Sequence, residues 1–484
     1  MALSLGTNGV RATFNKLNPQ AAADFAFAFS RSISKKRSSM PTIAIARDMR
    51  KTSPCLMQAA ASAIMEGGAN ALDIGLLPSP VAEWASMHFK CAGLIIITAS
   101  HNPPEYNALK FVDGRGVAIS RERGASYSKF LGKTHSPSLP WQSVGKLIKQ
   151  ENVLQEYERA VLDAVPKSSI TRKLKIVADP GNGTATIIAP ALMEKFGAKV
   201  ITINEKLDGT FPSRPSEPAE KNVSALIKKV KEEKADFGVA WDGDADRVIF
   251  VDENGQWLNG DKCVAISALH ALKEAQSAKG KFVVTTAATS MAVEAAAVSF
   301  GAKIKYTDVG APYLAEEMQK LGDAAVCGGE EVGGIIWPEF SLAKDGIFAV
   351  CKLMQMASIK PISKWVEELP KYYNAKTKIS AGAKEKAKVI SSLQKKILAE
   401  IKAGAKSQAG KAERREKAGK GGANEKMKLI SLIGGLRISF ENSWVLVRAS
   451  GTEEYIRIFA ESPSQKEAQG LMNKYKSMAK QFIA

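Results

Sequence analysis

Three aspartates spaced two residues apart form the clearest chemical motif in the sequence. In "WDGDADRVIFVD", Asp242, Asp244 and Asp246 alternate with Gly243 and Ala245. Residues two apart in extended backbone project to one side, so the three carboxylates are predicted to converge. Converging carboxylates repel one another unless a cation neutralises them, and hard oxygen ligands select Mg²⁺ or Ca²⁺. The motif therefore predicts a Mg²⁺ site, although an acidic turn without a metal has the same spacing.

The aspartate spacing also matches the start of an EF-hand calcium loop, with Glu253 at the last ligand position. That loop requires a glycine at its sixth position, where this sequence has Arg247. The residues after Arg247, "VIFV", are typical of a strand. An EF-hand is therefore excluded, and Mg²⁺ is the expected ion.

A serine and a histidine follow the apolar run "GLIII" in the segment "TASHNPPEYNALKF". Ligands gather at strand ends in α/β sheets, so Ser100 is a candidate nucleophile or phosphoryl carrier. His101 and Lys110 are candidate acid–base groups. Pro103 and Pro104 fix the backbone angle φ and hold the loop in one shape. Adjacent residues point apart in an extended chain, so no Ser–His dyad is expected.

Two further segments have the composition of ligand-binding turns. The segment "CGGEEVGG", residues 327–334, places glycines around Glu330, whose carboxylate can hold sugar hydroxyls. The segment "RASGTEE", residues 448–454, offers a phosphate cradle made of Arg448, Ser450, Gly451 and Thr452. Taken alone, each segment is equally well explained as a solvent-exposed turn.

Short β-rich runs alternate with amphipathic helical patterns along most of the chain. For example, "PTIAIARD" predicts a strand and "TSPCLMQAAASAIMEGG" predicts the helix that follows it. The alternation returns around residues 173–203 and 281–309, which predicts three related α/β units. From about residue 435 the pattern favours an antiparallel sheet closed by a helix, in a smaller fourth domain. The predicted domains are residues 1–145, 146–257, 258–375 and 376–484.

The length and composition restrict the class of protein. With 484 residues the chain is too long for one hydrophobic core. Its five scattered cysteines form no C-x-x-C pair, which predicts reduced thiols in a cytosol. No apolar run approaches the ~20 residues that span a bilayer, and the first residues lack the apolar segment of a secretory signal. A cytoplasmic location without membrane association is expected.

The net charge of +19 raises nucleic-acid binding without catalysis as an alternative function. Residues 404–425 are mainly Gly, Ala, Lys and Glu, and this composition predicts a flexible basic insert. The remaining charge is spread thinly and lacks the interleaved aromatic residues of a base-stacking surface. Diffuse positive charge also suits a small anionic substrate, so nucleic acid is not the expected partner.

Together and in this order, the motifs resemble the α-D-phosphohexomutases, which include phosphoglucomutase, phosphomannomutase and phosphoglucosamine mutase. The resemblance runs from "GTNGVR" to "RASGTEEYIRI" and covers essentially the whole chain. It implies three similar mixed α/β domains plus a smaller C-terminal α+β domain around a central cleft. It also implies a Mg²⁺-dependent isomerase that interconverts hexose 1-phosphate and hexose 6-phosphate of glucose and mannose, through a phosphoserine and a hexose 1,6-bisphosphate. Phosphoglucosamine mutase activity is the alternative.

The resemblance assigns roles to residues at the matching positions. Ser100 would be the phosphorylated carrier. The metal would be held by Ser100, Asp242, Asp244 and Asp246. Proton transfer and contact with the phosphoserine would fall to His101, Lys110, Arg11 and Arg247. The sugar hydroxyls and the phosphate that is not transferred would be bound by Glu330, Arg448, Ser450, Gly451 and Thr452.

A few positions depart from the pattern of the family. In "GTNGVRA", Asn8 and Ala12 replace an aspartate and a glycine. Val332 stands where serine or asparagine is frequent, which removes one hydroxyl contact to the sugar, and Ala311 stands where many relatives have histidine. None of these positions belongs to a principal catalytic group, so the departures are expected to affect the choice of substrate.

Overall fold

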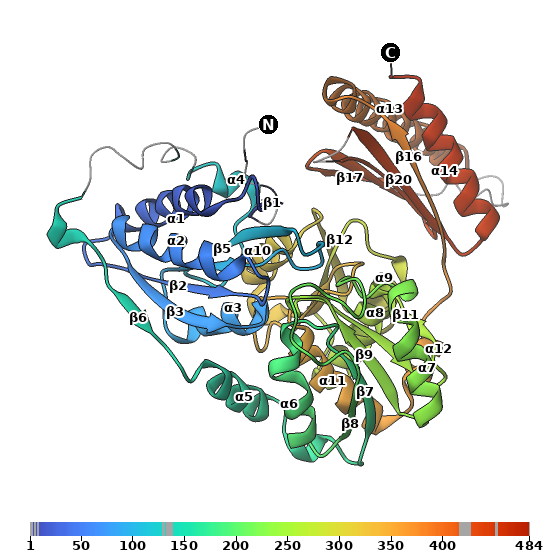
Figure 1. The fold of residues 1–484 in the computed structure, drawn as a ribbon. Helices are drawn as coiled ribbons and strands as arrows, with labels where there is room; N and C mark the ends of the chain where they lie inside the picture. The colour runs from blue at the N-terminus through green and yellow to red at the C-terminus, as the bar shows by residue number, and fades with distance from the viewer. Residues whose placement is uncertain are drawn as a thin grey trace. The chain divides into compact units, whose positions relative to one another are not determined.

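The structure is a computed structural model that describes residues 3, 6, 9–127, 131, 139–415, 427–450 and 454–483, with the backbone alone for 403–415 (Figure 1). These residues form two compact units. The first unit comprises Met1–Thr285, Ala296–Lys305 and Gly310–Leu369, and the second comprises Thr286–Ala295, Tyr306–Val309 and Pro370–Ala484. In the described part of the chain, no helix is both long enough and apolar enough to cross a membrane.

The first sheet has six strands in the order β1-β5-β4-β2-β3-β6. Its strands are β1 (Val10–Thr13), β2 (Thr42–Arg47), β3 (Asn70–Leu76), β4 (Gly93–Ile97), β5 (Tyr106–Asp113) and β6 (Leu147–Lys149). Strands β4, β2, β3 and β6 are mutually parallel, whereas β5 and β1 add antiparallel pairs at one edge. Every residue of β4, "GLIII", is buried, as expected for a central strand covered by helices on both faces.

The second and third sheets repeat this arrangement. The second, in the order β11-β10-β9-β7-β8, contains β7 (Lys175–Asp179), β8 (Lys199–Thr202), β9 (Phe237–Trp241), β10 (Val248–Asp252) and β11 (Trp257–Leu258). The third, in the order β13-β12-β14-β15, contains β12 (Phe282–Thr286), β13 (Lys303–Thr307), β14 (Ala325–Gly329) and β15 (Ile335–Ile336). In all three sheets the third strand of the repeat is followed by an antiparallel neighbour: β4 by β5, β9 by β10 and β14 by β15. The three related α/β units predicted from the sequence are confirmed.

The fourth sheet lies in the second unit and is antiparallel throughout. Its order is β16-β20-β19-β18-β17. The strands are β16 (Tyr373–Ser380), β17 (Lys428–Leu432), β18 (Gly435–Ser439), β19 (Trp444–Ala449) and β20 (Tyr455–Ser462). Apolar residues of helices α13 (Ala383–Arg415) and α14 (Gln465–Lys480) share one buried core with this sheet. The different topology confirms the predicted distinct C-terminal domain.

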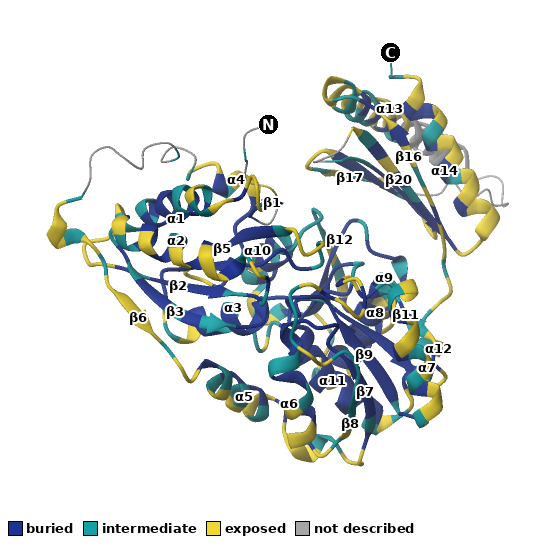
Figure 2. Cartoon of the chain, in the orientation of Figure 1, coloured by how far each residue is buried: buried dark blue, intermediate teal, exposed yellow. Residues whose placement is uncertain are grey.

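The remaining helices connect the strands and cover the sheets. They are α1 (Pro19–Ser34), α2 (Ser53–Glu66), α3 (Ser79–His88), α4 (Arg121–Gly124), α5 (Val153–Ala164), α6 (Ala189–Lys195), α7 (Ser224–Glu233), α8 (Gly260–Glu274), α9 (Met291–Ser299), α10 (Ala311–Leu321), α11 (Gly346–Ile359) and α12 (Ile362–Glu367). Figure 2 shows the central strands buried beneath helices whose outer faces are exposed. On the first sheet, α1 and α2 contribute Phe29 and Leu56 to a core that includes Ile95 of β4.

Helix α13 differs from the expectation for this part of the chain. It extends from Ala383 to Arg415, so residues 404–415 of the expected flexible insert have helical backbone. Alanine, lysine and glutamate have high helix propensity, and a helix that has already begun is extended at little cost. Residues 416–425 of the expected insert lie outside the described residues.

Candidate active site

The three motifs of the first unit occupy equivalent loops in the three related sheets. Ser100 follows β4 and precedes β5, the aspartates lie between β9 and β10, and Glu330 lies between β14 and β15. Each loop therefore joins the corresponding two strands of its own repeat. Since the repeats build one compact unit, the topology can bring three strand-end loops to one place.

The loop after β4 places Ser100 against the second sheet. Ser100 is buried, and its hydroxyl donates a hydrogen bond to Oδ2 of Asp242 at 2.5 Å. Its backbone is left-handed, with φ of 51°, which is uncommon for a residue with a side chain. His101 Nδ1 lies 3.4 Å from the serine Oγ. The prediction that these neighbours point apart is wrong, because it assumes extended backbone and Ser100 is not extended.

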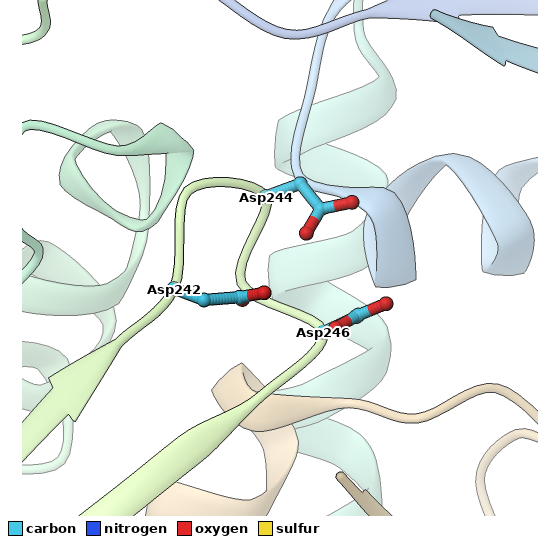
Figure 3. A group of neighbouring side chains, drawn as sticks. All are labelled: Asp242, Asp244 and Asp246. Atoms are coloured by element: carbon cyan, nitrogen blue, oxygen red, sulfur yellow. The ribbon is translucent and has the colours of Figure 1, made fainter. Parts of the chain in front are cut away.

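The three aspartates converge as predicted, but through a turn. Asp242, Asp244 and Asp246 are buried, and one oxygen from each lies within 4.8 Å of the others. Figure 3 shows their carboxylates directed to the same side of the loop. Ala245 adopts a left-handed φ of 61°, so the chain reverses within the motif. The aspartates share one side because the loop is tightly bent, and extended backbone is not the cause.

The helix α3 of the first repeat holds one of these aspartates. The backbone N–H of Ser79, the first residue of α3, donates to the carbonyl oxygen of Asp244 at 2.9 Å. The hydroxyl of Ser79 donates to Oδ2 of Asp244 at 2.5 Å. The positive end of a helix dipole stabilises a nearby carboxylate. Asp244 is therefore positioned by the first repeat although it belongs to the second.

Two buried lysines, Lys110 on β5 and Lys344 shortly before α11, neutralise Asp244 and Asp246. Lys110 Nζ lies 2.5 Å from Oδ2 of Asp244 and 3.0 Å from Oδ2 of Asp246, and Lys344 Nζ lies 3.4 Å from the latter oxygen. Burial lowers the pKa of both lysines, but their carboxylate neighbours outweigh it and raise each above its usual value. Burial raises the pKa of Asp246, but the lysines outweigh it and hold that pKa well below its usual range. These groups are therefore charged.

In Asp242 and His101, burial and neighbouring charges of the same sign both disfavour the charged form of the side chain. Burial, together with the charges of Asp246 and Asp244, raises the pKa of Asp242 to about 8. Burial, together with the guanidinium groups of Arg247 and Arg11, lowers the pKa of His101 to about 2. His101 is a neutral imidazole at neutral pH, which can accept a proton from a hydroxyl but carries none to donate as an imidazolium.

Two arginines contribute positive charge beside Ser100. Arg11 Nη1 donates to Oδ1 of Asn102, in the serine loop, at 2.6 Å. Within the described part of the chain, Arg247 Nε is buried without a hydrogen-bond partner, 4.0 Å from Oδ1 of Asp246. The pKa of Arg247 is raised, because Asp242 and Asp246 outweigh the effect of burial. These cations suit a site that holds an anionic group next to the serine.

The glycine-rich loop joins the same cluster through Lys344. Glu330 is buried, and its Oε2 lies 3.8 Å from Nζ of Lys344, the lysine that also contacts Asp246. Gly333 adopts a φ of 92°, and its carbonyl accepts a hydrogen bond from the backbone N–H of Val248 at 2.9 Å. The structure thus brings Ser100, the aspartates, both lysines and Glu330 together.

Gly243 makes a close contact between the serine loop and the aspartate loop. A Cβ at Gly243 would lie 2.7 Å from the carbonyl oxygen of Ser100 and 2.7 Å from Oγ of Ser216. Gly243→Ala is expected to lower the free energy of unfolding by about 1–3 kcal/mol, because the added methyl overpacks the contact. Urea unfolding measures this difference.

Gly470→Ala is the control for this prediction. Gly470 lies inside α14, and nothing lies within 4 Å of the position its Cβ would take. The control is expected to stabilise the protein by about 0.5–1 kcal/mol, since alanine replaces glycine in a helix. Equal midpoints for Gly243→Ala and the unmodified protein would contradict the packing argument.

Models of one protein family match the chain in four consecutive segments. They are described as phosphoglucomutase/phosphomannomutase alpha/beta/alpha domains I, II and III and the C-terminal domain. The matched residues are 2–128, 155–255, 259–373 and 366–475. A phosphoglucomutase/phosphomannomutase of Thermococcus kodakarensis is 36% identical over 97% of this chain and 96% of its own. The chain belongs to the phosphoglucomutase/phosphomannomutase family.

Other relatives of this mutase bear a different name or share mainly the fold. A phosphoglucosamine mutase of Methanococcus maripaludis is 30% identical over 99% of both chains. A solved phosphoglucomutase/phosphomannomutase family protein of Burkholderia thailandensis has a TM-score of 0.81 at 22% identity, covering 99% of this chain and 97% of its own. The Aspergillus fumigatus N-acetylphosphoglucosamine mutase, solved with GlcNAc-6P and magnesium, has a TM-score of 0.58 at 14% identity, covering 100% and 96%.

The aspartate cluster of the mutase fits the metal on which the family depends. Asp244 Oδ1 and Asp246 Oδ1 are buried without hydrogen-bond partners among the described residues. A buried carboxylate oxygen without a partner is costly, and a cation would satisfy it. With Asp242, these residues form a donor set made only of carboxylate oxygens, which suits a hard divalent ion.

The predicted phosphate-binding residues of the mutase belong to the second unit. Arg448 on β19 is paired in register with Arg457 on β20, so both lie at the same end of the fourth sheet. The backbone N–H of Ser450 donates to the carbonyl of Tyr455 at 2.9 Å, next to this pair. Gly451 and Thr452 lie outside the described residues. The structure thus groups Arg448, Ser450 and Arg457.

Several residues that build the site of the mutase have little or no signal in the sequence. Lys344 has no local signal, since it precedes helix α11 and reaches Asp246 only in the folded chain. Ser79 is read only as part of a helix pattern. Two further arginines are buried: Arg50, in "ARDMR" shortly after β2, and Arg214, in "PSRPSEP" between β8 and α7. An arginine next to a strand end with an aspartate close by is the signal that could have found Arg50.

Proposed function

We propose that the mutase interconverts hexose 1-phosphates and hexose 6-phosphates of glucose and mannose. A phosphorylated Ser100 and a hexose 1,6-bisphosphate are the intermediates of this proposal. The observation that carries it is the position of Ser100, whose hydroxyl lies 2.5 Å from Asp242, one of three clustered aspartates. Arg11 contacts Asn102 in the serine loop, and Arg247 lies 4.0 Å from Asp246. A serine in that setting suits phosphoryl transfer, which depends on positioning and charge neutralisation.

The proposed reaction consists of two phosphoryl transfers. In the first, the P–O bond to Ser100 breaks while the free hydroxyl of a hexose monophosphate forms a new P–O bond and loses its proton. His101, whose neutral ring lies 3.4 Å from the serine Oγ, is proposed to accept a proton, and the charged Lys110 is proposed to donate one. In the second, the other phosphate of the bisphosphate passes back to the serine, which releases the isomeric monophosphate.

We propose Mg²⁺ as the ion, held by Asp242, Asp244, Asp246 and the phosphorylated Ser100. Carboxylate and phosphate oxygens are the ligands Mg²⁺ prefers, and the cluster found among the described residues consists of three aspartates. When bound, the ion would neutralise charge on the phosphoryl oxygens. The magnesium in the Aspergillus fumigatus relative supports this choice.

Glu330 is proposed to hold sugar hydroxyls, with Lys344 fixing its carboxylate at 3.8 Å. Hydroxyls at C3 and C4 are common to glucose and mannose, so these contacts do not distinguish the two sugars. Arg448, Ser450, Gly451 and Thr452 are proposed to bind the phosphate that is not transferred.

A direct assay tests the proposal. Purified protein with glucose 1-phosphate, Mg²⁺ and a trace of glucose 1,6-bisphosphate is expected to form glucose 6-phosphate. Mannose 1-phosphate and glucosamine 6-phosphate serve as parallel substrates. Absence of turnover with every hexose and hexosamine phosphate would contradict the proposed reaction.

Val332 favours glucosamine phosphate as the second candidate substrate. An apolar side chain at this half-buried position of the sugar loop makes no hydrogen bond to a hydroxyl, and its size leaves room for an amino group at C2. Relatives named phosphoglucosamine mutase agree with this candidate. A kcat/KM for glucosamine phosphate well above tenfold that for glucose phosphate would replace the dual glucose and mannose assignment.

Val332→Ser is expected to raise kcat/KM for glucose and mannose phosphates by about two- to tenfold. One regained hydrogen bond is worth about 0.5–1.5 kcal/mol, which corresponds to that ratio. Steady-state kinetics with the three sugar phosphates measure it. Val298→Ser, at an exposed position of α9, is the control and is expected to leave all three ratios unchanged.

A further inference from the structure

Two buried arginines pair with aspartates at corresponding strand ends of the first two repeats. Arg50 follows β2, and its Nε lies 3.0 Å from Oδ2 of Asp48. Arg214 pairs through Nε, at 2.8 Å, with Oδ2 of Asp179, the last residue of β7. The strands β2 and β7 are the first parallel strands of their sheets and lie beside β4 and β9. Each pair is therefore next to the loop that carries one half of the reacting centre.

Arg50 binds the backbone of the serine loop. Its Nη2 donates to the carbonyl oxygens of Ser100 at 2.9 Å and Asn102 at 2.7 Å. Its Nη1 donates to those of Pro103 at 2.6 Å and Tyr106 at 3.1 Å. The side chain has no exposed surface. A single guanidinium thus fixes four carbonyls of the segment that begins with Ser100.

Arg214 does the same for the aspartate loop. Its Nη2 donates to the carbonyl of Trp241, the residue before Asp242, at 2.8 Å. Its Nη1 donates to the carbonyls of Pro215 at 3.0 Å and Ser216 at 3.3 Å. The hydroxyl of Ser216 then donates to the carbonyl of Ser100 at 3.2 Å. Arg214 thus contacts both the start of the aspartate loop and the residue that reaches the serine.

The hydrogen bonds made by Arg50 and those made through Arg214 and Ser216 meet at the carbonyl of Ser100. It accepts one hydrogen bond from Arg50 and one from Ser216. Ser100 has a left-handed backbone, which an ordinary residue keeps only where its surroundings impose it. The aromatic ring of Phe211, on the loop before Ser216, lies 4.9 Å from the Arg50 guanidinium and closes the contact.

We propose that Arg50 and Arg214 are positioning residues, which together set the serine hydroxyl against the aspartate cluster for phosphoryl transfer. This inference rests on the proposed function. Neither guanidinium bonds to the serine hydroxyl or to the three aspartate carboxylates, so both act through backbone carbonyls. In-line transfer is sensitive to displacement, and an error of about 1 Å can cost on the order of 100-fold in rate. Lysine keeps the charge of arginine but cannot supply its planar fork of donors.

The test compares lysine substitutions at three arginines. Arg50→Lys and Arg214→Lys are each expected to lower kcat by about 100-fold while KM changes less than about threefold. Arg172→Lys is the matched control, because Arg172 also donates to a carbonyl, that of Ala357, and to an aspartate, Asp236. It lies away from the loops and is expected to keep kcat and KM.

The rate is expressed per molecule that carries a phosphate, counted by intact-mass analysis after incubation with glucose 1,6-bisphosphate. This separates misplacement of the serine from simple loss of folded protein, which lowers the number of phosphorylated molecules and leaves their rate unchanged. A kcat per phosphorylated molecule within threefold of the unmodified enzyme, for both lysine variants, would overturn the proposal.

Ser216→Ala keeps the proposal testable if a lysine variant does not fold. It removes only the hydroxyl that donates to the Ser100 carbonyl and is expected to lower kcat about two- to tenfold. An unchanged kcat in this variant would overturn the proposed link between the two loops. If the unmodified protein shows no mutase turnover, the proposed function fails first, and the two failures are thereby distinguished.

Discussion

Replacing Ser100 with alanine is expected to abolish turnover and the phosphorylated form of the protein together. In the proposed mechanism every phosphate passes through the side-chain oxygen of Ser100, which alanine lacks. Loss of a nucleophile costs on the order of 10⁴-fold or more in kcat. Intact-mass analysis of the unmodified protein is expected to show a fraction heavier by one phosphate, and this fraction disappears in Ser100→Ala.

The control for this change is Ser126→Ala. The hydroxyl of Ser126 donates to a nearby carbonyl, that of Arg123, on the surface of the first unit. The variant is expected to keep both turnover and the phosphorylated fraction. Phosphate found on Ser100→Ala at another residue, or activity within tenfold of the unmodified protein, would refute the role of Ser100.

Removal of the metal is expected to have the second largest effect. Treatment with a chelator is expected to stop turnover, and added Mg²⁺ to restore it. Asp242→Asn tests the aspartate cluster directly. The amide oxygen of asparagine can still accept the hydrogen bond from Ser100, but the negative charge is lost. The variant is expected to lose at least about 100-fold in turnover, since even outer partners of metal ligands are worth 10–100-fold.

Metal binding itself is the second readout of this experiment. Titration calorimetry with Mg²⁺, or electron paramagnetic resonance with Mn²⁺, is expected to show one site in the unmodified protein and a weakened site in Asp242→Asn. Asp163→Asn is the control, since this aspartate is exposed on α5. Full activity after exhaustive chelation would contradict a metal at the aspartates.

Those parts of the site that consist of residues close together in the chain can be predicted from the sequence. The spacing of Asp242, Asp244 and Asp246 predicts their convergence, and the structure confirms the cluster. The reason given for it is incomplete, because the turn depends on the left-handed Ala245. The prediction that Ser100 and His101 point apart is wrong for the same reason, because Ser100 also has a left-handed backbone. Side-chain periodicity assumes a regular backbone, and strand-end loops do not have one.

Contacts between distant segments leave little trace in the sequence. Lys344 and Ser79 reach the aspartates from helix starts in other repeats, and nothing around them in the sequence indicates a carboxylate partner. The three-fold repetition of strand and helix patterns is visible and correctly predicts the fold class. The equivalence of the loops after β4, β9 and β14 follows from sheet topology, which hydrophobic periodicity does not specify.

Synthesis of the chain imposes an order on the assembly of this site. Lys110 is buried in the first sheet, yet its partner Asp244 is added to the chain 134 residues later. At about 5–20 residues per second, a ribosome needs roughly 7–27 s to supply that partner. During this interval the first sheet carries a lysine whose burial would be costly without a counter-charge. The ion pair between Lys110 and Asp244 therefore forms only after the aspartate loop of the second repeat has been synthesised.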